Sequence, residues 1–116
     1  MGNRIERVNA QIQKEVANII SYELNDPRLE NELISVLRVE TASDLKYVKI
    51  FVSIYGNKDK QEVLDAIKSA GGYIRKLLTP KIDLRVVPML DFRLDESLDY
   101  SEKIDEIIKD LNKKNS

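Results

Sequence analysis

A helical stripe of apolar residues runs through the segment DAIKSAGGYIRKLL and its N-terminal flank, although two adjacent glycines lie inside it. Apolar side chains recur there at steps of four, three, four and three residues, at Val63, Ile67, Ala70, Ile74 and Leu77. That spacing predicts helix with one buried face. Gly71 and Gly72 each cost a helix interior about 1 kcal/mol relative to alanine. Because the stripe keeps its phase across the glycines, we expect two helical halves that meet at a bend and pack on one core.

Two further helices are predicted from the same period. The first covers about residues 4–24, and the residue before Pro27 is pushed out of helical geometry. Its apolar stripe consists of Ile5, Val8, Ile12, Val16, Ile19 and Leu24. The last begins near Ser97 and frays in the tail NKKNS, over about residues 97–116. Its apolar residues are Tyr100, Ile104, Ile107, Ile108 and Leu111.

Three segments alternate with period two and predict strands. In YVKIFVSIY one face carries Val48, Ile50, Val52 and Ile54, and the other carries Tyr47, Lys49, Phe51, Ser53 and Tyr55. The preceding ISVLRVE is its expected hairpin partner across the polar link TASD. In LRVVPMLDFRL the alternating apolar set is Leu84, Val86, Leu90, Phe92 and Leu94. Pro88 inside that segment favours an edge strand or a bulge.

The order of elements predicts one α+β domain over residues 1–116. A helix, two strands, a helix, the glycine break, a helix, a strand and a final helix follow one another without a linker or repeat. Three strands joined in this way give a sheet with helices on one face. No apolar run of 18 residues and no signal peptide is evident, so we expect a cytoplasmic protein without a membrane segment.

The residue types argue against catalysis. The chain has no cysteine and no histidine, which excludes disulfides, thiolate nucleophiles, the usual zinc sites and an imidazole base. Carboxylates such as Asp44, Asp65, Asp91 and Glu96 fall in no recognised catalytic motif. We therefore expect a binding protein with no cofactor and no metal, and not an enzyme.

The net charge of −1 argues against a general nucleic-acid binder, but the charge is unevenly distributed. Residues 1–58 hold 8 Lys and Arg and 8 Asp and Glu, residues 59–94 hold 7 and 5, and residues 95–116 hold 4 and 7. An acidic C-terminal region thus accompanies a mildly basic middle. Ordinary scatter of surface charge is an equally good interpretation of these counts.

The element order resembles a type II KH fold, a single-strand nucleic-acid module whose middle helices are joined by a GxxG loop. Here Ala70-Gly71-Gly72, an Ala-x-Gly kink, stands in place of GxxG. With that feature the chain resembles the ribosome-binding factor A family of bacterial small-subunit maturation factors. The pieces that match in order are RIERVNAQIQKEVANII, LNDPRL, VETASDLKYVKIFVSIYG, SAGGYIRKLL, LRVVPMLDFRLDES and KIDEIIKDL. The slight overall acidity departs from what we expect of a ribosomal RNA binder.

The resemblance implies a monomeric ribosome biogenesis factor that binds the immature 30S subunit and its 16S ribosomal RNA. It further implies late maturation, including 5′-end rRNA processing by other enzymes, importance in cold adaptation, and release with help from a ribosome-maturation GTPase. Another hypothesis is a KH-like protein-interaction module that binds ribosomal proteins without RNA contact. In that case the acidic last helix would be the contact surface.

Candidate RNA-binding residues lie around the kink and on the flanking elements. They are Arg4, Arg7, Arg28, Lys68, Ala70, Gly71, Gly72, Arg75, Lys76, Lys81 and Arg85. Arg75 lies off the apolar stripe, so we predict it to be exposed and free for phosphate. For Gly72 we predict a positive backbone angle or a close contact. The alternatives are solvated surface charges for the basic residues, and glycines that only allow tight packing of helix on sheet.

The aromatic residues of the middle strand offer a second type of contact. Tyr47, Phe51 and Tyr55 share one face, which could stack bases if that face is exposed, as Lys49 and Ser53 suggest. The alternative is that this face belongs to the core.

Overall fold

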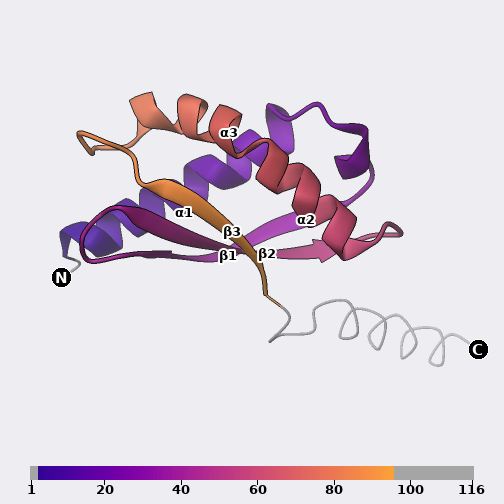
Figure 1. Cartoon of the computed structure of the whole chain (residues 1–116), viewed down its shortest axis with the longest axis horizontal. Helices are drawn as coiled ribbons and strands as arrows, with labels where there is room; N and C mark the ends of the chain where they lie inside the picture. The colour runs from indigo at the N-terminus through magenta and orange to yellow at the C-terminus, as the bar shows by residue number, and fades with distance from the viewer. Residues whose placement is uncertain (1–2, 96–116) are drawn as a thin grey trace, which may run out of the picture.

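The computed structural model describes residues 3–95, in which all the long helices lie on one face of a three-stranded sheet (Figure 1). The elements are α1 (Arg4–Tyr22), η1 (Pro27–Leu29), β1 (Leu33–Thr41), β2 (Tyr47–Tyr55), α2 (Lys60–Ser69), α3 (Gly71–Leu78), η2 (Thr79–Lys81) and β3 (Met89–Leu94). This order confirms the predicted α+β arrangement. The predicted last helix lies outside the described residues. Between residues 3 and 95 no helix is long and apolar enough to cross a bilayer.

α1 forms where the apolar period predicts it. The Asn3 side chain caps the helix by accepting the Glu6 N–H at 2.8 Å. Its buried face consists of Val8, Ile12, Val16, Ile19 and Ile20. The prediction that the helix reaches residue 24 is wrong by two residues, since Glu23 already forms its C-cap. Leu24 still packs on the core, but from the segment that follows the helix.

β2 is the central strand and provides the floor of the core. It pairs antiparallel with β1 and parallel with β3. Val48, Ile50, Val52 and Ile54 are at most 2% exposed, so the predicted inward face is confirmed. The helices cover this face with apolar side chains from each helix, such as Ile12, Ile67 and Ile74.

Side-chain amides of α1 bind the outer edge of β1. Asn9 Oδ1 accepts hydrogen bonds from the backbone N–H and the hydroxyl of Thr41. Gln13 Nε2 donates to the carbonyl oxygens of Val36 and Leu37, at 3.1 and 3.3 Å, where the register of β1 shifts. These bonds satisfy edge groups that the sheet leaves unpaired.

β3 is an edge strand, as Pro88 suggested, but it is shorter than the alternating segment. Pairing begins at Met89, whose N–H bonds to the Lys46 carbonyl at 2.9 Å. Proline has no N–H to give to a ladder, so the strand starts after it. The prediction that Leu84 and Val86 belong to the strand is therefore wrong: both lie in the preceding loop, and Val86 is 68% exposed.

The helical region breaks one residue before the glycines. α2 begins after its cap Asp59, which accepts the Gln61 N–H, and it ends at Ser69. Ala70, with φ −87° and ψ 3°, links it to α3, which starts at Gly71. Both halves bury their stripe in the same core, as predicted.

The amide contacts of α1 with β1 predict a difference between two otherwise similar substitutions. Asn9→Ala should lower the free energy of unfolding by about 1–2 kcal/mol, because the Thr41 N–H and hydroxyl lose their acceptor. Asn18→Ala gains the same helix propensity at an exposed position of α1 and should be neutral or slightly stabilising. Urea unfolding of both variants measures the difference, and equal values would contradict the proposed role of Asn9.

Candidate nucleic-acid interface

An open groove of about 570 Å³ lies at the end of the molecule where α1 begins. Three segments far apart in the sequence meet there, namely the start of α1, the β1–β2 turn and the loop before β3 (Figure 1). α3 contributes Arg75. We call it the end groove, and its lining residues are Arg4, Asp44, Leu45, Lys46, Tyr47, Arg75, Leu84, Arg85, Val86, Val87, Pro88 and Met89.

The end groove is strongly basic. Four of its lining residues are cationic, namely Arg4, Lys46, Arg75 and Arg85, and only Asp44 is acidic. Arg7, one turn after Arg4 on α1, joins Arg4 in a smaller adjacent hollow that also includes Asp83. Arg4, Lys46 and Arg85 are exposed, so they can meet an anion in solvent. The structure thus brings Arg4, Arg7, Arg75 and Arg85 of the predicted set together.

Arg75 is less exposed than the sequence predicts. It is half-buried, and its Nε and Nη2 donate to the Val87 carbonyl oxygen at 3.1 and 2.6 Å. The prediction of an exposed, free guanidinium is wrong, because the loop before β3 folds back over α3 and meets it. Arg75 therefore fixes one wall of the end groove. Lys76, the next residue, is exposed as predicted.

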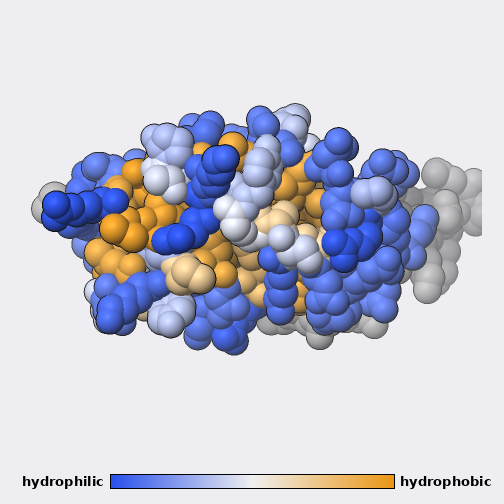
Figure 2. Space-filling model, turned by 45° about the horizontal axis from the view of Figure 1, so that its top comes forward, coloured by the Kyte–Doolittle hydropathy of each residue, from blue (hydrophilic) through white to orange (hydrophobic). Residues whose placement is uncertain are grey.

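Apolar side chains are unusually exposed in the end groove. Tyr47, Val86 and Met89 are 60%, 68% and 55% exposed. They make up three of the six large hydrophobic residues that are exposed between residues 3 and 95. Figure 2 shows hydrophobic side chains gathered, among hydrophilic ones, toward the end of the molecule where the loop before β3 lies in Figure 1. A surface that is both apolar and cationic suits an amphipathic anion.

The glycine pair needs a different explanation from those offered by the sequence. Neither glycine has a positive φ, and a Cβ at either position would meet no atom of residues 3–95 within 4 Å. The predicted positive angle at Gly72 is therefore wrong, and within residues 3–95 the glycines make neither a close contact nor tight packing on the sheet. Both residues occupy the first turn of α3 with open space beside them. No contact within the described chain requires a glycine at either position.

The remaining basic residues of the predicted set lie outside the end groove. Lys68 and Lys76 are exposed on either side of the half-buried Ala70, so they flank the glycine junction. Lys81 is exposed, and its Nζ forms an ion pair with Glu15 Oε2 of α1 at 3.6 Å.

Arg28 does not join the basic end, because the whole length of α1, about 28 Å, separates its segment from Arg4. It pairs with Asp26 at 2.9 Å. The hydrogen bond from the Arg28 side chain lowers the pKa of the Asp26 carboxyl, with a further contribution from the Arg28 backbone N–H.

The open face of the sheet does not offer three free aromatic rings for stacking, which was one of the two interpretations of the sequence. The guanidinium of Arg38 covers the Phe51 ring, 3.9 Å from its centroid, and itself pairs with Asp95 at 2.6 Å. Ser53 is only 4% exposed, so the expectation that it lies on the surface is wrong. Of the three aromatic residues considered for stacking, Tyr47 is exposed, whereas Phe51 and Tyr55 are half-buried.

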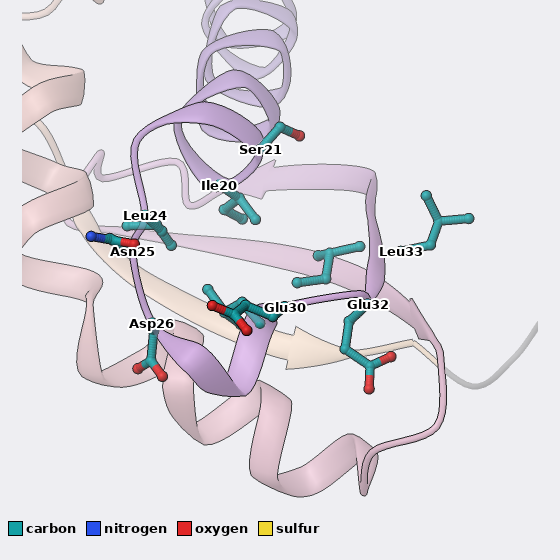
Figure 3. Close-up of a pocket in the computed structure, with 10 residues that line it drawn as sticks. Ile20, Ser21, Leu24, Asn25, Asp26, Glu30, Glu32 and Leu33 are labelled. Atoms are coloured by element: carbon teal, nitrogen blue, oxygen red, sulfur yellow. The ribbon is translucent and has the colours of Figure 1, made fainter.

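A second pocket, of about 320 Å³, lies between the end of α1 and the start of β1 (Figure 3). Its lining includes the carboxylates of Asp26, Glu30 and Glu32 and apolar residues such as Ile20 and Leu24. This acidic lining does not suit RNA. No group of three or more carboxylates within residues 3–95 is arranged to hold a metal ion.

Lys46 is the functional candidate that the sequence alone did not single out. It lies in the β1–β2 turn. The Met89 N–H bonds to the Lys46 carbonyl, which brings this turn next to the start of β3 and so places Lys46 in the end groove. The one local signal was a lysine next to Tyr47 in a hairpin turn.

Comparison with known proteins gives a consistent match. The family model Ribosome-binding factor A matches residues 4–108. Ribosome-binding factor A of Caldanaerobacter subterraneus subsp. tengcongensis is 40% identical over 114 residues, which cover 97% of this chain and 93% of the relative.

Solved structures extend the comparison to the fold. The crystal structure of ribosome-binding factor A from Thermus thermophilus has a TM-score of 0.69 at 24% identity, covering 78% of this chain and 93% of the other. A homology model of the Thermus thermophilus factor, fitted into a cryo-EM map of a 30S complex, has a TM-score of 0.62 at 25% identity. That likeness covers 76% of this chain and 91% of the other.

The contact of Arg75 with the loop before β3 predicts that replacing Arg75 destabilises the fold, whereas replacing the adjacent Lys76 does not. Arg75→Ala should lower the free energy of unfolding by about 1–2 kcal/mol, because the Val87 carbonyl loses two donors. Lys76→Ala should stay within about 0.5 kcal/mol of the parent protein. Chemical denaturation compares the two, and an unchanged Arg75→Ala protein would contradict the anchoring role.

The open space beside the glycines predicts that alanine at Gly72 stabilises the fold, whereas a close contact would have predicted that it destabilises the fold. Gly71→Ala and Gly72→Ala should each raise the free energy of unfolding, by up to about 1 kcal/mol, since alanine is the better helix former and meets no atom. Thermal melting tests this directly. A lower melting temperature for either variant would show that the junction carries strain.

Proposed function

This chain belongs to the ribosome-binding factor A family, and we propose that it is an assembly factor that binds the immature 30S subunit through 16S ribosomal RNA. The family match over residues 4–108 carries the proposal. The Thermus thermophilus factor, which has been fitted into a map of a 30S complex, supports the same partner.

The basic end of the molecule supplies the chemistry that the proposal needs. Exposed cations at Arg4, Arg7, Lys46 and Arg85 can contact phosphates without reading sequence. Their grouping answers the objection raised by the net charge of −1, because a local cationic surface binds RNA whatever the charge of the rest.

The glycine junction supplies a second surface for the RNA backbone. Gly71 and Gly72 have no side chains and no neighbours on their open side, and Lys68 and Lys76 flank them. A phosphate backbone can approach the first turn of α3 closely there, because no side chain stands in its way.

The finer parts of the proposal follow the family. The protein would act in the cytoplasm as a monomer, by binding and without catalysis. It would promote late maturation of the subunit, including 5′-end processing of the 16S precursor by other enzymes, with importance in the cold. A ribosome-maturation GTPase would assist its release.

Charge reversal in the end groove tests the RNA-binding surface. Lys46→Glu and Arg85→Glu should each weaken binding to immature 30S subunits and reduce the slope of log K against log salt by about one. Lys60→Glu, at the first position of α2, is the matched control and should bind as the parent does. Salt titrations of all three proteins, with circular dichroism to verify folding, provide the measurement. Binding that is equal for all three would move the RNA surface elsewhere, and salt-independent binding would favour a ribosomal protein as the partner.

Gly72→Ala separates function from stability at the junction. It should weaken subunit binding even though it raises the melting temperature, because the added methyl group holds the RNA backbone away from α3. Leu33→Ala, at an exposed position of β1, controls for small surface changes. A stabilised Gly72→Ala protein with unchanged subunit affinity would remove the junction from the interface.

A further inference from the structure

We propose that the end groove takes one unpaired nucleotide of the RNA, with its base against Tyr47, Val86 and Met89 and its phosphate among Arg4, Lys46 and Arg85. This inference rests on the proposed function and specifies what one part of the RNA surface recognises. It commits to an extruded base, as opposed to a paired helix or a protein segment.

The apolar part of the groove is built into the fold. Tyr47 and Met89 are register partners at the start of the parallel pair β2–β3, so their side chains lie next to each other. Val87 and Pro88, both buried, anchor the loop between Val86 and Met89 and leave those two side chains outside. The result is an exposed aromatic ring beside the apolar side chains of a valine and a methionine, and a planar base can stack on that ring.

The position of the cations distinguishes an RNA occupant from an apolar peptide. Arg4, Lys46 and Arg85 come from three different segments and surround the same apolar surface, with Asp44 as the single opposing charge. A nucleotide joins an apolar base to an anionic phosphate, and this groove pairs the complementary groups. A paired duplex hides its base faces, so only an unpaired nucleotide can use the ring of Tyr47.

The volume and rigidity of the groove fit a ligand of this size. Its volume of about 570 Å³ falls within the range of about 300–1,000 Å³ that is typical of small-molecule sites. The Arg75 hydrogen bonds to Val87 hold the loop in place before any ligand arrives. The wall is therefore pre-formed, which reduces the entropy lost on binding.

The test uses three RNA hairpins that are identical except at one position, which carries a bulged nucleotide, an abasic bulge or a paired nucleotide. The full-length protein should bind the bulged nucleotide about tenfold more tightly than the abasic bulge, because only the former offers a base to stack. Tyr47→Leu and Val86→Ser should each abolish this preference. Tyr22→Leu changes another exposed tyrosine, on α1, and should retain it. Fluorescence anisotropy at fixed salt measures all the affinities.

The outcomes separate this inference from the proposed function. Equal affinity for the bulged and abasic hairpins, with normal binding to 30S subunits, overturns the nucleotide site and leaves the assembly-factor proposal standing. Loss of subunit binding in Tyr47→Leu without any bulge preference in the parent protein also overturns it, and assigns the groove to a protein partner. Failure of the parent protein to bind immature 30S subunits at all would overturn the proposed function itself.

Discussion

The burial of one face of β2 is the interaction on which the rest of the molecule depends. Val48, Ile50, Val52 and Ile54 form a continuous apolar floor, and the three long helices each cover part of it. Because β2 lies between β1 and β3, it also fixes where the β1–β2 turn and the start of β3 come to lie. The position of the end groove therefore follows from the register of the central strand.

The end groove shows how a few polar contacts turn that register into a surface. The carbonyl of Lys46 accepts the first ladder bond of β3, which places Tyr47 beside Met89. The guanidinium of Arg75 then holds the loop before β3 at Val87. An arginine that was expected to be free and exposed thus shapes the surface, and the cations around it are the exposed ones.

Within residues 3–95 the sequence was sufficient for the order of the long helices and strands, because apolar periodicity reports which face of a segment is buried. It was insufficient where contacts between distant segments decide the outcome. Nothing local to Arg75 reveals that the Val87 carbonyl lies within its reach, and nothing near Phe51 reveals that Arg38 covers its ring. Similarly, glycines in a helical stripe indicate a break, but only the surroundings of Gly71 and Gly72 show that nothing in the described chain packs against them. Lys46 and Arg4, far apart in the sequence, become neighbours only through tertiary structure.

The amides that α1 places on β1 have a consequence for the behaviour of the protein at high concentration. A sheet with unpaired edge groups can recruit a strand from another copy, which is a common route to aggregation. Asn9 and Gln13 hydrogen-bond to the edge groups of β1, at its end and at the register shift in its middle. On the other side of the sheet, Pro88 offers no N–H just before β3 begins. Addition of a strand from a second copy at the β1 edge is thereby disfavoured, because it would have to displace these side-chain hydrogen bonds.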